Sequence, residues 1–557
     1  MTNGITFGPN SVRTSDISSN GPLSPRMDQI PEKIWSLHPT MVLRGDGSMA
    51  VRSVVDSALL FSTRLQCIVR EMWTSAVCSI IVLVVVALLS SCGGGSKAPV
   101  PSILNINNST TPSSPVGLAI EINGSGFQGA PGKVVFTQSG ITATVTPNSS
   151  GWTDSGIVVA VPSGNGTSSF TVSGTVNVTV VTSGGTSNAA TLNLIQTLTF
   201  DVNNVTWATT TPLPAAMSGM RAVAVPGASS ISAFVVVTGG FDGTSDLTSV
   251  YSNTLNSDGT VSGNWTSITT NPLPVTVAHH GMAEADPGNS LVAANSRFIY
   301  VLGGQQHSTD TPGGTSNVYM ASVDPNTGAI GTWTQLSRNL PETLVGPAVS
   351  IFNGYLYVVG GLRADGTPSP NVYSAAVKPD GTLGSWTTAT NVYPTPVSFA
   401  QAFGFGGKLY VVDGEFGTST DPNQQGNVGT SAVNFASAIN GALGAWTNTS
   451  GTIKSRTKHI TWTAFGQVIA GEGIYAGSPG SLELERTVVQ PDSTLGSWNG
   501  ITSSVNQMNA NVYNGATLVS PLQSPTATPR FLLFGGQAFT MTPPGALSNT
   551  VYYNNAP

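Results

Sequence analysis

The C-terminal part of the sequence repeats itself, and this repetition limits the fold more than any other feature. Tryptophan recurs at intervals of 58, 68, 53, 60 and 52 residues. These tryptophans are Trp207, Trp265, Trp333, Trp386, Trp446 and Trp498. An apolar run that ends in a glycine pair follows each of them, at 235–240, 299–304, 356–361 and 532–536, or in a diverged form at 411–415 and 468–472. The pattern predicts six similar β units between residues 200 and 557.

A Val-Tyr pair follows each intact glycine pair, as at Val250-Tyr251, and a turn then leads back to tryptophan. This order resembles the kelch repeat, and the resemblance implies a six-bladed kelch-like β-propeller with one four-stranded blade per copy. Trp207 has no glycine pair before it, and Tyr552 has no tryptophan after it. The strand around 205–209 is therefore expected to complete the sheet that begins near 510, which leaves no free edge.

Residues 99–196 show a different pattern, in which apolar residues alternate with polar ones in short runs separated by turns. The clearest runs are 120–122, 134–136, 157–161 and 176–180. This spacing favours a β-sandwich. Together with Gly124-Ser125-Gly126-Phe127 and Trp152-Thr153-Asp154, the segment resembles an IPT/TIG domain, which has an immunoglobulin-like fold. The resemblance implies that Trp152 fills the core. The fold class is therefore predicted as all-β, a sandwich followed by a propeller.

An uncharged, mostly apolar segment at 72–91 precedes Leu89-Ser90-Ser91-Cys92 and a Gly/Ser-rich stretch. The motif resembles a bacterial lipobox, which implies a lipoprotein signal peptide at 72–91, lipidation of Cys92, a flexible tether at 92–98, and anchoring to the outer membrane or cell surface. A retained transmembrane anchor is the alternative. We expect residues 1–71 to be disordered or a mis-assigned extension, with the true start near Met49, Val69 or Met72.

Only 8% of the residues are charged, the formal net charge is −6, and Gly and Pro number 64 and 36. Because about 25% charge is usual, this composition excludes a coiled coil and a charged disordered tail. It also argues against nucleic acid, which needs a basic face. The three cysteines are Cys67, Cys78 and Cys92. Cleavage before Cys92 would leave no other cysteine, so we expect no disulfide or cysteine-ligated metal.

In a kelch propeller, the segments that enter the first strand or leave the second strand of each unit open on one face, and a ligand site is expected there. The candidates for ligand binding are Arg221, His280, His307, Arg363, Glu415, His459 and Glu472. Glu415 and Glu472 occur where the glycine pair is lost. No HxH or HExxH spacing is present, so neither a metal nor a cofactor is expected.

The sequence therefore predicts an exported lipoprotein that binds a protein or glycan without catalysis. The alternative is an epimerase- or oxidase-like enzyme acting on extracellular carbohydrate, with Glu415 or Glu472 as acid/base and Arg221 or Arg363 orienting a carboxylate. The copper site of galactose oxidase, which has a similar architecture, requires a cysteine that a mature chain starting at Cys92 would lack. A scaffold role for the tandem domains is a third possibility. No catalytic residue is assigned.

Overall fold

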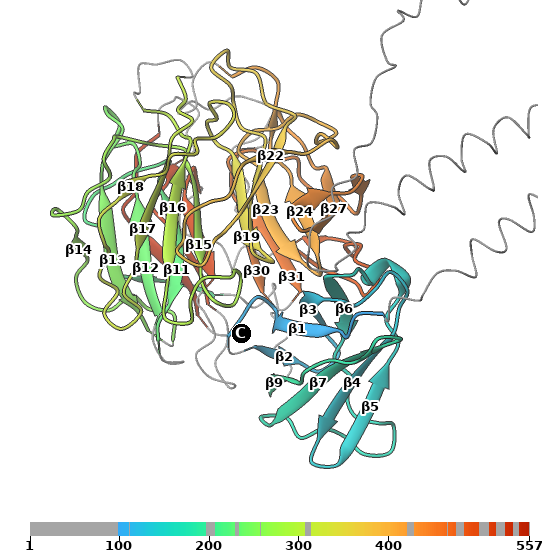
Figure 1. The fold of residues 1–557 in the computed structure, drawn as a ribbon. Coiled ribbons are helices and arrows are strands. Elements are labelled where there is room, and N and C mark those ends of the chain that lie inside the picture. Colours follow the sequence, from blue (N-terminus) through green and yellow to red (C-terminus); the bar gives the residue numbers. More distant parts are fainter. Residues whose placement is uncertain are drawn as a thin grey trace, which may run out of the picture. The chain divides into compact units, whose positions relative to one another are not determined.

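A computed structural model of the chain describes residues 98–110, 112–195, 206–228, 233–256, 258–306, 313–419, 428–464, 466–474, 484–500, 512–519, 530–538 and 545–555. These residues form β-strands and one short 3-10 helix, Ser149–Gly151 (Figure 1). The predicted all-β class is thus confirmed. The predicted extension, signal peptide and lipidation site, including Cys92, lie outside the described residues. Within the described ranges, no helix is long and apolar enough to cross a membrane.

The N-terminal sheets, β1–β9, form two layers around one core (Figure 1). One layer has the order β1 (Ser102–Ile106), β3 (Ala119–Ser125), β6 (Gly156–Ala160). The other has the order β2 (Ser113–Pro115), β9 (Ala190–Ile195), β7 (Thr175–Thr182), β4 (Lys133–Gln138), β5 (Ile141–Val145), and β8 (Gly185–Thr186) also pairs with β7. Trp152 is buried in this core, and its indole N–H donates to the carbonyl oxygens of Phe127 and Gln128 at 3.1 and 2.9 Å.

Six further sheets follow, each built mainly of four antiparallel strands. The first five are β11 (Arg221–Pro226), β12 (Ala233–Thr238), β13 (Val250–Leu255), β14 (Thr266–Ser267); β15 (Gly281–Ala285), β16 (Phe298–Leu302), β17 (Val318–Ser322), β18 (Thr334–Gln335); β19 (Ala348–Phe352), β20 (Tyr355–Val359), β21 (Val372–Ala376), β22 (Thr387–Thr388); β23 (Gln401–Phe405), β24 (Lys408–Val412), β27 (Val433–Ile439), β28 (Ala442–Leu443), β29 (Thr447–Asn448); and β30 (Ile460–Ala464), β31 (Gln467–Gly471), β32 (Leu484–Val488), β33 (Asn499–Gly500). Two short pairs lie beside them, β25 (Glu415–Phe416) with β26 (Val428–Gly429), and β34 (Val512–Tyr513) with β37 (Gln537–Ala538).

The sixth sheet joins the two ends of this region. It has the order β10 (Thr206–Thr210), β38 (Val551–Asn555), β36 (Phe531–Phe534), β35 (Ala516–Val519). β10 pairs with β38 from Thr206 opposite Asn555 to Thr210 opposite Val551. The prediction that the strand near 205–209 completes the last sheet is therefore confirmed.

Neighbouring sheets share cores in a cyclic order. Each of six hydrophobic clusters combines residues from two of these sheets that follow one another, and the cluster with Val235 and Phe534 joins the first sheet to the sixth. The cluster of the fourth and fifth sheets also includes Ala119 and Val158 of the N-terminal sheets. We call β11, β15, β19, β23, β30 and β35 the first strands of the six sheets. Each first strand contacts the next one in this order, and β35 contacts β11. Burial of apolar surface between sheets is the main favourable contribution to such packing.

The tryptophan repeat connects neighbouring sheets. Four indole N–H groups donate to a carbonyl oxygen of the preceding sheet: Trp265 to Thr211 (3.1 Å), Trp386 to Arg338 (3.1 Å), Trp446 to Asn391 (3.1 Å) and Trp498 to Ser450 (2.8 Å). Trp462, which is out of phase with the repeat, lies on β30 and stacks on Trp207 with ring centroids 5.6 Å apart. The aromatic positions thus bind one sheet to the next.

Backbone hydrogen bonds just before the first strands also link neighbouring sheets. Six residues with positive φ, between 52° and 66°, occupy equivalent positions there: Gly219, His279, Gly346, Phe399, Lys458 and Asn514. Backbone N–H groups of one sheet donate to the carbonyl of the preceding one, as His279 does to Gly219 and Gly346 does to His279, both at 2.7 Å. Further links at 2.8, 2.8 and 3.2 Å join Phe399 to Gly346, Gly219 to Asn514, and Asn514 to Lys458. The sheets are therefore connected through their backbones at this end.

Candidate functional site

Two of the predicted ligand-binding residues line one cavity at the beginning of the first strands. This axial cavity has a volume of about 110 Å³ and receives residues from the entrances of β11, β15, β19, β23, β30 and β35. Its polar side chains include those of Arg221, Gln401, His459 and Thr517. The structure thus brings Arg221 and His459 together, although they are 238 positions apart in the sequence.

Arg221 is the first residue of β11 and is half-buried. Its Nη1 donates to the Met220 carbonyl oxygen at 2.9 Å. Burial lowers the pKa of its guanidinium to about 10, so the side chain is charged at neutral pH. Among the residues that the structure describes, no carboxylate forms an ion pair with Arg221. The axial cavity therefore carries a positive charge without a counter-ion from these residues.

His459 precedes β30 and is 2% exposed. Both ring nitrogens are buried without a hydrogen-bond partner in the described part of the chain. Burial, followed by the positive charge of Arg456, lowers the pKa of His459 to about 3, so the imidazole is neutral at physiological pH. A neutral imidazole offers one donor and one acceptor to a ligand in the axial cavity.

His280 is completely buried and has a structural contact instead. Its Nε2 lies 2.9 Å from the Thr238 hydroxyl, a hydrogen bond between the first two complete sheets. Burial, and then the charges of Arg221 and His279, hold its pKa well below the usual value. His307 lies outside the described residues. The structure therefore gives His280 a role in joining sheets.

Arg363 lies away from the axial cavity, in a partly exposed ion pair. Its Nε donates to Glu342 Oε2 at 2.9 Å, and the two side chains are 34% and 20% exposed. Burial alone would raise the pKa of Glu342, but hydrogen bonds from Ser369, Arg363 and Tyr373 outweigh it and lower the pKa. Ser369 and Tyr373 donate to Oε1 and Arg363 to Oε2. Because Arg363 is engaged in this ion pair, it has little freedom to orient a ligand.

Glu415 is fully buried beside the fourth and fifth of these sheets. Its Oε2 accepts a hydrogen bond from the Thr457 hydroxyl at 2.9 Å and lies 3.8 Å from the Lys458 ammonium. Lys458 Nζ also lies 5.1 Å from the centre of the Phe399 ring. These contacts balance the buried charge of Glu415, and the carboxylate does not line the axial cavity.

Glu472 is also fully buried, and it occupies the position of the first glycine in the lost pair. In the intact copies the first glycine has a φ of 51–61°, as at Gly239, and Asp413 and Glu472 occupy this position with φ of 51° and 53°. The prediction placed Glu415 at the lost pair, whereas the structure places Asp413 there and Glu415 two residues later. Positive φ is uncommon for a non-glycine residue, so surrounding contacts hold these two acids in place.

A buried ion pair, missed by sequence reasoning, stabilises the same region. Arg456 Nη2 lies 2.7 Å from Glu485 Oε1, and its Nη1 donates to the Glu472 carbonyl at 3.2 Å. Asp413 accepts a hydrogen bond from the Thr452 hydroxyl at 2.6 Å, and burial raises its pKa well above the usual value. The only sequence signal was several charged residues near 452–459 in a chain with few charges.

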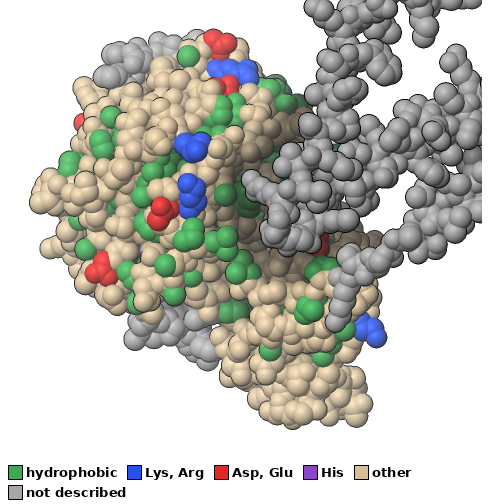
Figure 2. Space-filling model, in the orientation of Figure 1, with side chains coloured by type: hydrophobic (Ala, Val, Ile, Leu, Met, Phe, Trp, Pro, Cys, Tyr) green, Lys and Arg blue, Asp and Glu red, His purple; other side chains and the backbone are tan. Residues whose placement is uncertain are grey.

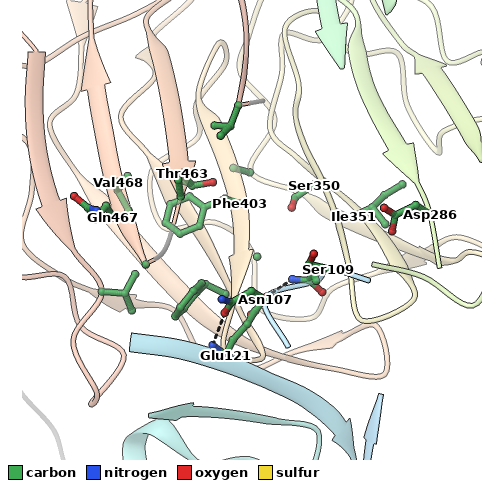
Figure 3. A pocket seen from close by; sticks show the side chains of 18 of the residues that line it. Asn107, Ser109, Glu121, Asp286, Ser350, Ile351, Phe403, Thr463, Gln467 and Val468 are labelled. Carbon is green, nitrogen blue, oxygen red and sulfur yellow. Dashed lines mark hydrogen bonds between the residues drawn. The ribbon is translucent and has the colours of Figure 1, made fainter. Parts of the chain in front are cut away.

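A larger cavity lies where the N-terminal sheets meet the opposite ends of the first strands (Figure 3). This junction chamber has a volume of about 510 Å³. Figure 3 shows Phe403, Thr463 and Gln467 on one side of it, Ser350, Ile351 and Asp286 on the other, and Asn107 with Glu121 below. Sequence reasoning missed it because its lining comes from segments far apart in the chain.

Glu121 connects the two parts of the molecule at this chamber. Its carboxylate accepts hydrogen bonds from the backbone N–H of Gly406 and from the side-chain amide of Asn108. Burial, opposed by these and other hydrogen bonds, raises its pKa to about 7. The side-chain amide of Asn105 also donates to the Gly288 carbonyl, and Ala119 packs in one cluster with Phe405.

The surface carries few charges, as the composition implies. Figure 2 shows scattered Lys, Arg, Asp and Glu side chains among mostly uncharged groups on the face drawn. In the described ranges, no group of three or more His, Cys, Asp or Glu is placed to hold a metal ion. Comparison with models of known protein families finds no matching family. Comparison with curated proteins finds no match either. The interpretation therefore depends on the geometry of this chain.

Proposed function

We propose that this protein is an exported, lipid-anchored binding protein that recognises an acidic glycan at the axial cavity. In this proposal the N-terminal sheets are an IPT/TIG-type immunoglobulin-like domain over 99–196, and the six C-terminal sheets are the blades of a kelch-like propeller over 200–557. The cyclic cores and the β10–β38 pairing support the propeller. The two-layer core around Trp152 supports the sandwich.

The observation that carries the ligand class is the charge of Arg221 in the axial cavity. Among the described residues its guanidinium has the Met220 carbonyl as a partner but no carboxylate. A guanidinium in such a partly buried site favours a ligand carboxylate, which it binds through parallel hydrogen bonds. Gln401 and neutral His459 add uncharged hydrogen-bonding groups of the kind that sugar hydroxyls use. A single carboxylate on a glycan differs from nucleic acid, whose many phosphates require a basic face that this chain lacks.

The enzymatic alternative has less support in the geometry. It requires Glu415 or Glu472 beside a ligand, but neither residue lines the axial cavity or the junction chamber. Glu415 is occupied by Thr457 and Lys458. A general acid must reach the atom that it protonates, so we favour binding without catalysis.

Titration calorimetry of the full chain with galacturonate oligosaccharides, and with galactose oligosaccharides for comparison, tests the ligand class. We expect binding of the acidic series alone, and a loss of at least tenfold in affinity in Arg221→Gln. Arg338→Gln is the matched control, because the Arg338 side chain is exposed and its Nη1 donates to the Ser385 hydroxyl. The Arg338 carbonyl, which accepts from the Trp386 indole, is kept in this variant. Equal affinity in wild type and Arg221→Gln, or no binding of the acidic series, would overturn the proposal.

Export and lipidation are tested separately by intact mass and membrane fractionation of wild type and Cys92→Ala. We expect a wild-type chain that starts at an acylated Cys92 and a variant that is neither cleaved nor acylated. A wild-type chain that retains residues 72–91 would instead support the transmembrane anchor.

A further inference from the structure

The junction chamber has the construction of a small-molecule site. Its volume of about 510 Å³ falls within the range of about 300–1,000 Å³ that is usual for ligand pockets. Residues from five of the six first strands line it, Asp286 directly follows the remaining one, β15, and the loop after β1 closes it from the N-terminal sheets. Thr110 is exposed, whereas Ser350 and Thr463 are half-buried. Solvent therefore reaches the interior past the loop.

One buried group in the chamber lacks a partner. Gln467 is 6% exposed, and its Oε1 has no hydrogen-bond partner in the described part of the chain. Leaving such an acceptor unpaired costs free energy, and a ligand hydroxyl would satisfy it. Thr463 lies on the same side of the chamber as Gln467, and Ser350 lies on the opposite side (Figure 3).

The charges around the chamber exclude several ligand classes. No Lys, Arg or His is among the described residues that line it, so an anion would find no counter-charge. Two acids line it, but both are already engaged. Glu121 accepts from Gly406 and Asn108, and Asp286 Oδ1 accepts from the backbone N–H groups of Gly288 and Asn289 at 2.6 and 2.9 Å. Burial also raises the pKa of both carboxyls. An organic cation would therefore gain little.

An aromatic ring completes the site. Phe403 lines the chamber, and one of its faces stacks on Tyr410 with ring centroids 4.8 Å apart and an interplanar angle of 2°. Tyr410 is fixed in turn by a 2.8 Å hydrogen bond from its hydroxyl to the Ser493 carbonyl. A rigid aromatic group near uncharged hydrogen-bonding groups suits a molecule with both C–H faces and hydroxyls.

We propose that the junction chamber binds a neutral saccharide of one or two sugar units. In this complex Gln467, Ser350 and Thr463 hydrogen-bond to sugar hydroxyls, and Phe403 packs against the C–H face of a sugar ring. The N-terminal sheets then form part of the binding site through Asn107 and its neighbours. This site is separate from the axial cavity and does not depend on the acidic ligand proposed there.

Titration calorimetry of the full chain with a panel of neutral mono- and disaccharides, and with choline as the cationic probe, tests this inference. We expect saturable binding of at least one neutral sugar and none of choline. Gln467→Leu removes the unpaired acceptor at similar volume and should weaken sugar binding about five- to tenfold. Ser350→Trp places an indole ring in the chamber and should weaken sugar binding.

Two controls separate this site from other effects. Gln335→Leu makes the same chemical change on the exposed β18 strand and should bind sugar like wild type. Arg221→Gln should also leave neutral sugar binding unchanged, because it alters only the axial cavity. If Gln467→Leu or Ser350→Trp fails to fold, the wild-type titrations still decide the matter. Absence of binding by every neutral sugar, or binding of choline in their place, would refute the inference.

Discussion

Glu121 gives the molecule a pH dependence that can be calculated from its surroundings. Its pKa is raised from 4.5 to about 7 in the folded chain, chiefly by burial. Between these two pH values the folded chain therefore keeps a proton that the unfolded chain has lost. The stabilisation from this protonated carboxyl is complete below pH 4.5, and it is lost as the pH rises from 4.5 through about 7. At about 1.36 kcal/mol per pKa unit, the loss is about 3 kcal/mol.

Glu121→Gln removes this ionisation and keeps the side-chain shape. Compared with wild type, its unfolding free energy should fall about 3 kcal/mol less between pH 4.5 and pH 8. Unfolding entropy is about 2.1 cal/mol/K per residue, so for roughly 460 residues the difference is about 3 °C in melting temperature. Differential scanning calorimetry of both proteins at the two pH values measures it.

Glu342→Gln is a control of opposite sign. The pKa of Glu342 is lowered in the folded chain. Its contribution is therefore present at neutral pH and is lost as the pH falls through that lowered pKa. If Glu121→Gln shows the same decline in melting temperature between pH 4.5 and pH 8 as wild type, then Glu121 does not titrate as its buried position requires, and the reasoning is wrong.

Two further predictions concern buried groups among the six C-terminal sheets. Arg456→Ala leaves Glu485 buried without its 2.7 Å partner and should lower the unfolding free energy by about 3–5 kcal/mol, measured by guanidinium titration. The double replacement Arg456→Met with Glu485→Leu should recover most of this loss. A double variant as unstable as Arg456→Ala would contradict this account. Trp462→Ala removes the stack on Trp207 and the 3.0 Å hydrogen bond to the Leu532 carbonyl. It should lower the unfolding free energy by about 3–5 kcal/mol in the same titration. A loss below about 1 kcal/mol would show that the Trp462 contact is dispensable.

The strand pattern could be read from the sequence because it repeats. Apolar runs, glycine pairs and Trp207 without a preceding pair were sufficient to predict the β units and the completion of the last sheet by β10. These features are local in the sequence, and their recurrence in several copies makes each strand easier to recognise. Trp462 had no place in the repeat, since its contacts with Trp207 and Phe531 arise only when distant strands meet.

The candidate site was predicted only in part. Arg221 and His459 reach one cavity because both lie at the start of a first strand, Arg221 as the first residue of β11 and His459 directly before β30. Glu415 suggests a functional group because it is an acidic residue in a diverged copy, yet inside the protein its carboxylate contacts the Thr457 hydroxyl and the Lys458 ammonium. Such pairing depends on side-chain directions in three dimensions, which the repeat does not encode.

The junction chamber had no sequence signal for a similar reason. Glu121 and Gly406 are 285 positions apart, and they meet through the packing of the N-terminal sheets on the ends of the first strands. Asn, Ser and Thr side chains are common in exposed β turns of this polar chain. Only their convergence around one space distinguishes Asn107, Ser350 and Thr463 from the rest.

The pairing of β10 with β38 affects how a chain of this kind can change in length. β10 comes before the first complete sheet in the sequence and belongs to the last sheet in space. Each sequence repeat, counted from tryptophan to tryptophan, therefore contains the outer strand of one sheet and three strands of the next. Gene duplication or loss of a whole repeat between β11 and β33 would add or remove one sheet and leave the β10–β38 pairing untouched. The number of sheets is thus open to evolutionary change, whereas the two strands that close the series must be inherited together.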